Sequence, residues 1–297
     1  AHEFGPAVFR ELGAEITVIN AEPDGRNINL NAGSTHPEAL QAAVVASGCD
    51  FGVAYDGDAD RCLAVDHEGT LIDGDKIMGA LAVNARERGA LAHDTLVVTV
   101  MSNLGLILAM REVGIKTVQT GVGDRYVLEE MLASGYSLGG EQSGHIIARD
   151  YATTGDGILS SLLISRMVKE SGRSLTDLTS FIQRLPQTLI NVGGVDRAAA
   201  STNEAVAAAV AAAEARLGDT GRVLLRPSGT EPLVRVMVEA ATQEEADSVA
   251  ASLADVVKVS DEDIEWLTGG APVDEVVERW LGMGPALVVV TRGKHGS

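Results

Sequence analysis

The stretch TLVVTVMSNLGLILAMREVGIKTVQ, residues 95–119, contains one complete strand-helix-strand pattern. Its first six residues form an apolar run of strand type, and its last four form another. Between them, residues 104–114 repeat apolar side chains at helical spacing and end in Gly114. Ser102 or Asn103 can cap this helix, and Gly114 suits the left-handed conformation after its end. Strands that alternate with helices in this way predict α/β layers.

The same alternation continues on both sides of this stretch. Strand-like runs at residues 15–19 and 51–55, with a helical pattern at residues 6–13, extend it toward the N-terminus. After about residue 187 the pattern changes to a helix of high propensity, a strand-turn-strand unit and another helix. The sequence therefore predicts mixed α/β domains followed by a small α+β domain, with a short additional α/β tail.

Composition narrows the classes of function. The 297 residues are too many for one ordinary domain, and 23 Lys+Arg against 42 Asp+Glu give a net charge of -19. This charge argues against nucleic acid or an anionic membrane as a partner. No apolar run approaches the roughly 20 residues that span a bilayer, and the first residues do not form a signal peptide. Cys49 and Cys62 form neither a disulfide framework nor a metal pattern, so we expect a cytoplasmic protein.

The first loop that carries chemistry is Asp56-Gly57-Asp58-Ala59-Asp60-Arg61, directly after the strand-like run at residues 51–55. Three carboxylates at alternate positions repel one another, and a hard divalent cation would compensate them. Ligands that are all oxygen favour Mg²⁺ over zinc, and Arg61 can hold a phosphate beside the ion. The alternative is a solvated acidic turn. Its place at the carboxyl end of a strand favours the metal interpretation.

The second loop is Gly139-Gly140-Glu141-Gln142-Ser143-Gly144-His145. Its glycines let the backbone approach a ligand closely, while Glu141, Ser143 and His145 offer an acceptor, a hydroxyl and a titratable donor for sugar hydroxyls. A flexible turn with an incidental histidine is an equal alternative when the loop is considered alone.

The third loop is Arg226-Pro227-Ser228-Gly229-Thr230-Glu231-Pro232, and Arg235 follows in the next strand-like run. Two hydroxyls, backbone amides around a glycine and two guanidinium groups form a concentrated set for binding phosphate in a very acidic protein. The alternative is a hairpin turn that is rich in Pro, Ser and Gly only for its geometry.

Together, in this order and spacing, the three loops resemble the α-D-phosphohexomutase superfamily over about residues 1–257. The stretch Thr120-Gly121-Val122-Gly123-Asp124-Arg125-Tyr126 is similar to the sugar-specificity loop of the phosphoglucosamine mutase branch. The resemblance implies the following roles. Asp56, Asp58 and Asp60 would hold Mg²⁺, Arg61 would lie by the transferring phosphate, Asp124, Arg125, Glu141, Ser143 and His145 would contact the sugar, and Arg226, Ser228, Gly229, Thr230 and Arg235 would bind the non-reacting phosphate.

The resemblance also implies an activity and a domain order. Such enzymes interconvert hexosamine 6-phosphate and 1-phosphate through a bisphosphate, for the synthesis of amino-sugar nucleotides and cell-wall precursors. We expect the second family domain at residues 1–70, the third at 71–186 and the fourth at 187–257. The family's phosphoserine loop, of the Thr-Ala-Ser-His-Asn-Pro type, does not occur in these 297 residues. We therefore expect binding without turnover from this chain alone.

The tail, residues 258–297, follows a different pattern. Together with the preceding Ala254-Asp255-Val256-Val257 it resembles an internal piece of a ribokinase-like sugar kinase, which indicates a junction of unrelated sequences at that tetrapeptide. The kinase family's Gly-Ala-Gly-Asp anion hole is absent, so the tail should phosphorylate nothing. An apolar strand at residues 286–290 is expected to expose an edge.

Three interpretations stay open at this point. The chain is a phosphohexomutase that needs its catalytic-serine domain, a non-catalytic phosphosugar-binding module or fragment, or, on the tail alone, a sugar kinase. Uncovered apolar surface in the first layer and at the tail strand predicts self-association.

Overall fold

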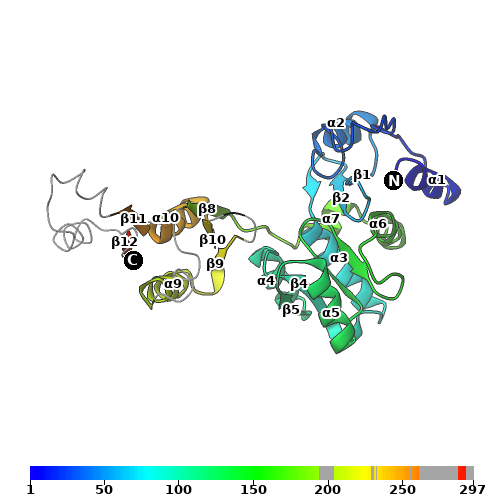
Figure 1. Cartoon of the computed structure of the whole chain (residues 1–297). Helices are drawn as coiled ribbons and strands as arrows, with labels where there is room; N and C mark the ends of the chain where they lie inside the picture. Colours follow the sequence, from blue (N-terminus) through cyan, green and yellow to red (C-terminus); the bar gives the residue numbers. More distant parts are fainter. Residues whose placement is uncertain (194–203, 229–230, 232, 255, 261–286, 292–297) are drawn as a thin grey trace. The chain divides into compact units, whose positions relative to one another are not determined.

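The computed structural model describes residues 1–193, 204–228, 231, 233–254, 256–260 and 287–291. The chain divides into two compact units, Ala1–Arg184 and Leu185–Ser297. Mixed α/β domains make up the first unit, and a small α+β domain with a short strand pair makes up the second (Figure 1). The predicted fold class is therefore confirmed.

A four-stranded sheet forms the centre of the larger domain in the first unit. Its strand order is β5-β4-β6-β7, in which β5, β4 and β6 are parallel and β7 is antiparallel to β6. The strands are β4 (Thr95–Thr99), β5 (Lys116–Thr120), β6 (Leu138–Gly140) and β7 (Ile146–Ala148). The helices of this domain are α3 (Gly74–Glu87), α4 (Leu104–Glu112), α5 (Asp124–Ser134), α6 (Gly157–Ser171) and α7 (Leu175–Thr179), with a short 3-10 turn at Ala92–Asp94.

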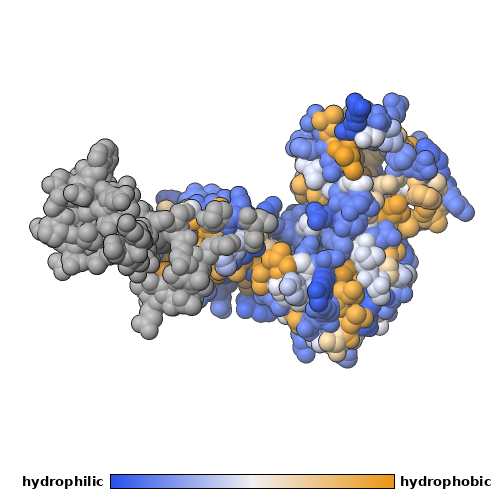
Figure 2. Space-filling model, viewed as in Figure 1, coloured by the Kyte–Doolittle hydropathy of each residue, from blue (hydrophilic) through white to orange (hydrophobic). Residues whose placement is uncertain are grey.

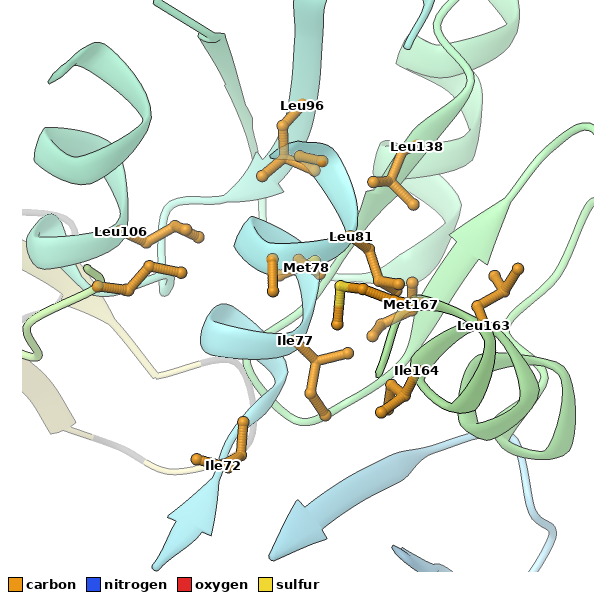
Figure 3. Close-up of a cluster of buried hydrophobic side chains, with 14 of the residues drawn as sticks. Ile72, Ile77, Met78, Leu81, Leu96, Leu106, Leu138, Leu163, Ile164 and Met167 are labelled. Atoms are coloured by element: carbon orange, nitrogen blue, oxygen red, sulfur yellow. The ribbon is translucent and has the colours of Figure 1, made fainter. Parts of the chain in front are cut away.

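Helices cover both faces of this sheet, which is why β4 is buried along its whole length. Leu96 and Val98 of β4 belong to one apolar cluster, which Figure 3 shows gathered around Ile77, Met78 and Leu81 of α3. Val97 points to the other face, where it joins Val127 and Met131 of α5. Successive strand residues point to opposite faces, so one strand contributes to two cores.

Both ends of the helix predicted in the strand-helix-strand pattern are confirmed. Asn103, rather than Ser102, is the N-cap of α4, and its side chain accepts a hydrogen bond of 2.9 Å from the backbone N–H of Gly105. Gly114 has a φ of +74°, the left-handed conformation expected after a helix.

A three-stranded antiparallel sheet, β1-β2-β3, precedes this domain. Its strands are β1 (Phe51–Tyr55), β2 (Cys62–Asp66) and β3 (Leu71–Ile72), and its helices are α1 (Phe4–Glu11) and α2 (Glu38–Ser47). Gly52 of β1 allows α2 to pack closely, since a Cβ there would lie 2.5 Å from Val44. On the other face the hydroxyl of Tyr55 lies 2.7 Å from that of Ser161 in α6. Because α6 also contacts β7 of the four-stranded sheet, it packs against both sheets.

The strand predicted at residues 15–19 is wrong. These residues form no regular element, and the described strands of this sheet run β1-β2-β3 only. An apolar run becomes a strand only where another strand pairs with it.

Apolar side chains lie on the surface of the N-terminal segment. Phe4, Leu12, Ile28 and Leu30 are each at least 66% exposed, and Figure 2 shows orange residues around α1. The self-association expected from uncovered apolar surface stays a prediction, which light scattering would check.

The second unit contains a three-stranded antiparallel sheet of order β8-β10-β9. Two helices pack on this sheet and bury Val223, Val236 and Val249. The elements are β8 (Gln187–Gly193), β9 (Arg222–Pro227), β10 (Leu233–Glu239), α9 (Glu204–Leu217), α10 (Gln243–Ala254) and the 3-10 turn Gly218–Thr220.

The described part of the tail is a strand pair. β11 (Val256–Ser260) pairs in parallel with β12 (Leu287–Thr291), so the strand expected at residues 286–290 is present, one residue further on. The sequence between these strands also contains two helical patterns, which lie outside the described residues. In the part of the chain that the structure describes, no helix combines the length and the apolar character that crossing a membrane requires.

Candidate functional site

Loops of the first unit meet where its parallel strands end. β4, β5 and β6 are parallel, so their carboxyl ends lie at one edge of the sheet, where α/β folds commonly bind ligands. Gly123, just after β5, donates a backbone hydrogen bond of 3.1 Å to the carboxylate of Glu141, just after β6. The acidic loop after β1 reaches the same place, because the N–H of Cys62 donates to the carbonyl of Gly144 at 3.0 Å.

The acidic loop brings its three carboxylates together. Asp56, Asp58 and Asp60 each place a carboxylate oxygen within 4.8 Å of the others. Burial raises the pKa of Asp56 above its ordinary value, and the neighbouring carboxylate of Asp60 raises it further, while the N–H of Arg61 acts in the opposite direction. The loop therefore holds more negative charge than its surroundings compensate.

Arg61 is the cation nearest to these carboxylates among the described residues. Its Nε lies 3.7 Å from Asp56 Oδ2 and 3.9 Å from Asp60 Oδ1, and its side chain is 43% exposed. Gly157, the first residue of α6, fixes the loop from behind. Its N–H donates to the carbonyl of Ala59 at 2.8 Å, and a Cβ at this position would lie 2.5 Å from the carbonyl oxygen of Arg61. The guanidinium group therefore stays near the acids with its end accessible.

The second loop, residues 139–145, is called the sugar loop after the role expected for it, and His145 joins it to the acidic loop. Its Nδ1 lies 2.9 Å from Asp60 Oδ2, and its Nε2 accepts a hydrogen bond of 3.1 Å from the backbone N–H of Gly155. Both ring nitrogens of His145 thus have hydrogen-bond partners within the protein, and its contact with a sugar hydroxyl stays a prediction.

Glu141 and Ser143 remain available at the same edge. Glu141 is partly buried and Ser143 is exposed, and the Ser143 hydroxyl lies 3.4 Å from Glu141 Oε2. Gly144 lets the loop turn back against the acidic loop, because its φ is +92° and a Cβ would lie 2.4 Å from the carbonyl oxygen of Cys62. The loop can thus present one acceptor and one hydroxyl to a polar ligand.

Asp124 and Arg125 begin α5 and are both exposed. Asp124 Oδ2 lies 3.8 Å from His145 Nε2, which places it at the edge of the cluster. The guanidinium of Arg125 instead pairs with Glu129, one turn along its own helix, at 2.7 Å. The structure thus brings Asp124 near His145, whereas the side chain of Arg125 is directed along α5.

Asp75 is an acid of this region that sequence reasoning missed. It is 2% exposed, and its Oδ2 accepts hydrogen bonds from the N–H of Asn103 at 2.7 Å and from the amide of Gln142 at 2.9 Å. Burial raises its pKa to about 7, with help from the negative charge of Asp73. Asp75 therefore ties the sugar loop to the cap of α4.

The third loop lies in the second unit. Arg226 of β9 and Arg235 of β10 are direct register partners, so their side chains share one face of the sheet. Arg235 also pairs with Glu231 at 2.9 Å, and the Ser228 hydroxyl accepts from the N–H of Glu231 at 3.2 Å. Gly229 and Thr230 lie outside the described residues. Like charges placed opposite each other favour the binding of an anion.

The acidic loop fits a magnesium ion. Its ligands are all carboxylate oxygens, which hard divalent cations prefer. Asp60 Oδ1 is buried and makes no hydrogen bond to any residue that the structure describes. Since a buried acceptor is normally satisfied, a cation at the loop would satisfy this oxygen.

Comparison with known families identifies three successive domains. Residues 1–69 match the model of phosphoglucomutase/phosphomannomutase domain II. Residues 73–185 match that of domain III, and residues 189–256 match that of the C-terminal domain.

Curated relatives agree with these matches. The phosphoglucosamine mutase of Bifidobacterium animalis subsp. lactis is 66% identical over 252 residues, which cover 85% of this chain and 56% of the relative. That of Nocardioides sp. is 62% identical over 258 residues, which cover 87% of this chain and 58% of the relative. The chain therefore spans little more than half the length of these relatives.

Solved structures show the same fold. The N-acetylphosphoglucosamine mutase of Aspergillus fumigatus, in complex with GlcNAc-6P and magnesium, has a TM-score of 0.67 at 24% identity, with 84% of this chain and 59% of that chain covered. A second structure of that fungal mutase has a TM-score of 0.69 at 26% identity, with 84% of this chain and 58% of that chain covered. Residues 1–256 thus consist of domains II, III and IV of the phosphoglucomutase/phosphomannomutase type, and this part of the chain belongs to the phosphohexomutase superfamily.

Proposed function

We propose that residues 1–257 provide the metal-binding, sugar-binding and phosphate-binding parts of a phosphoglucosamine mutase. The proposed reaction interconverts hexosamine 6-phosphate and 1-phosphate through a bisphosphate. The observation that carries the proposal is the meeting of the acidic loop with the sugar loop at one edge, through the hydrogen bond between Cys62 and Gly144. We keep the domain boundaries at residues 70, 186 and 257 as part of the proposal.

The proposed roles follow from the chemistry of each group. Asp56, Asp58 and Asp60 would hold Mg²⁺, which supplies positive charge against a phosphate oxygen. Arg61, with its exposed guanidinium end, would lie beside the transferring phosphate. Glu141 and Ser143 would bind sugar hydroxyls, and Asp124 and Arg125 would contribute to sugar specificity.

The second unit would bind the phosphate that does not react. Arg226 and Arg235 face the same side of the sheet, and an anion between them would remove their mutual repulsion. Ser228, Gly229 and Thr230 would add hydroxyl and backbone donors. The two free thiols, Cys49 and Cys62, support the cytoplasm as the place of action.

Arg226→Ala should weaken the binding of glucosamine 6-phosphate by about 10-fold or more, the value of a hydrogen bond to a charged group. Isothermal titration of glucosamine 6-phosphate into the whole chain, in the presence of Mg²⁺, measures this change. Arg216→Ala is the matched control, because Arg216 is exposed on α9 and should leave the affinity unchanged.

Equal affinity in the Arg226→Ala and control proteins would remove the third loop from the proposal. The mutase and the phosphosugar-binding module both predict binding, so turnover separates them. Only a mutase should convert glucosamine 6-phosphate when a separately expressed N-terminal domain of a phosphoglucosamine mutase is added.

A further inference from the structure

The His145 ring is held in one tautomer. It is 4% exposed, and the backbone N–H of Gly155 points at its Nε2 at 3.1 Å. A backbone N–H can only donate, so Nε2 must present its lone pair. In a neutral imidazole the proton then lies on Nδ1, which donates to Asp60 Oδ2 at 2.9 Å.

This hydrogen bond determines which oxygen of Asp60 is left for a cation. Oδ2 is occupied by His145, whereas Oδ1 is buried and makes no hydrogen bond within the described residues. The carboxylate therefore cannot rotate without losing its bond to the ring. A histidine that orients a ligating carboxylate is a typical neighbour of a metal site.

The surrounding backbone is built to keep the ring in place. Arg61 and His145 form an isolated antiparallel bridge, so the histidine is attached to the end of the acidic loop. Gly155 contacts the ring so closely that a Cβ at this position would lie 2.4 to 2.5 Å from three ring atoms. Only glycine leaves room for the ring and donates its N–H at the same time.

We infer that His145 is a positioning residue for Asp60, which it holds with Oδ1 directed to the cation, and that Gly155 sets its tautomer. The inference rests on the proposed function, in which Asp60 is a ligand of Mg²⁺.

The affinity of the whole chain for Mn²⁺, a paramagnetic probe of magnesium sites, tests the inference. Free Mn²⁺ is measured by electron paramagnetic resonance. His145→Ala should bind Mn²⁺ about 10-fold to 100-fold more weakly than the wild type, the usual cost of losing a group behind a metal ligand. Gly155→Ala should weaken binding in the same direction, because its methyl group displaces the ring while the imidazole remains.

Two conservative variants separate the hydrogen bond from simple packing. The amide of His145→Asn can place its N–H near the position of Nδ1 and should restore most of the affinity. His145→Gln reaches the position of Nε2 instead and should behave like His145→Ala. Equal Mn²⁺ affinity in the wild type and His145→Ala would overturn the inference, as would an Asn variant that binds as weakly as the Ala variant while both remain folded.

The tautomer can also be measured in the unmutated protein. A long-range ¹⁵N–¹H spectrum should show His145 protonated at Nδ1, and protonation at Nε2 alone would overturn the inference even if the variants do not fold. A wild type that binds no Mn²⁺ would remove the proposed metal site itself, and the inference with it. A wild type that binds normally beside an unaffected His145→Ala would overturn only the role of His145.

Discussion

Asp58→Asn should unfold at a higher temperature than the wild type in metal-free buffer, and should gain almost no stability when Mg²⁺ is added. Asp58 lies within 4.8 Å of two other carboxylates and is exposed, so its replacement removes repulsion without breaking a buried contact. Without metal, the free energy of unfolding of Asp58→Asn should exceed that of the wild type by on the order of 1 kcal/mol, as expected for neighbouring charges near water.

With Mg²⁺ the same substitution acts in the opposite direction. Removing one of three charged ligands should weaken the ion's binding more than about 100-fold, beyond the cost of losing a group behind a ligand. At a Mg²⁺ concentration of about 100 times the wild-type Kd, the ion stabilises the wild type by about 2.7 kcal/mol. The variant, with 100-fold weaker binding, would gain only about 0.4 kcal/mol at that concentration.

Thermal unfolding followed by circular dichroism, in EDTA and along a Mg²⁺ titration, measures both effects. Asp50→Asn is the matched control, since Asp50 is exposed just before β1 and lies outside the cluster. If Asp58→Asn kept the full stabilisation by Mg²⁺, the loop would be a solvated acidic turn rather than a metal site.

The acidic loop and the arginine pair share one physical feature. Each holds like charges close together, the carboxylates in the first unit and Arg226 opposite Arg235 in the second. Such charges destabilise a protein without its ligand and become favourable only when an ion of opposite charge binds. Arg226→Ala should therefore leave the ligand-free protein at least as stable as the wild type, although it binds phosphate less well.

The sequence predicted the elements whose signals are local. The run at residues 95–100 and the caps around α4 are such signals, and β4 and Asn103 confirm them. Residues 15–19 have equally strong local character but form no strand, because pairing depends on a distant partner that the pattern does not reveal. β6 was missed for the opposite reason, since Leu138–Gly140 is short and rich in glycine, yet it pairs on both sides.

The sequence predicted the site residues whose chemistry follows from their spacing. It missed the residues that only the packing of distant segments brings into the site. Asp56, Asp58 and Asp60 stand at alternate positions, so their grouping could be read directly. Gly155 lies ten residues from His145, and nothing in the sequence says that its N–H meets the ring. Asp75 follows Asp73 and Gly74 and looks like part of a solvated acidic turn, whereas the returning loop at Gln142 buries it.

The stability of the wild type should depend on pH partly through the buried carboxyl of Asp75, and Asp75→Asn should remove this part. An exposed acid would not produce it. The pKa of Asp75 is raised by burial from 3.8 to about 7 in the folded protein. Between these values the unfolded chain has lost the proton and the folded chain retains it, so the wild type becomes less stable as pH rises. The slope is about 1.4 kcal/mol per pH unit, and it ends near the folded pKa.

The asparagine variant should follow the wild type closely near pH 4 and exceed it increasingly toward pH 7. Its side-chain carbonyl can still accept from the N–H of Asn103 and the amide of Gln142, so the neutral forms of the two proteins resemble each other. Between about pH 4 and pH 7 the difference in the free energy of unfolding between the two proteins should reach about 4 kcal/mol, since this interval covers about three pH units. Urea unfolding at pH 5, 6, 7 and 8 measures it, with the exposed Asp150→Asn as control.

A difference between Asp75→Asn and the wild type that stays flat with pH would mean that Asp75 is ionised in the folded protein throughout. The hydrogen bonds from Asn103, Ser102 and Gln142, which favour the charged carboxylate, would then outweigh its burial. The sugar loop would in that case be held by a permanent buried charge. A difference that grows with pH means instead that a largely neutral acid ties this loop to α4 in acid solution, and that it ionises only near pH 7.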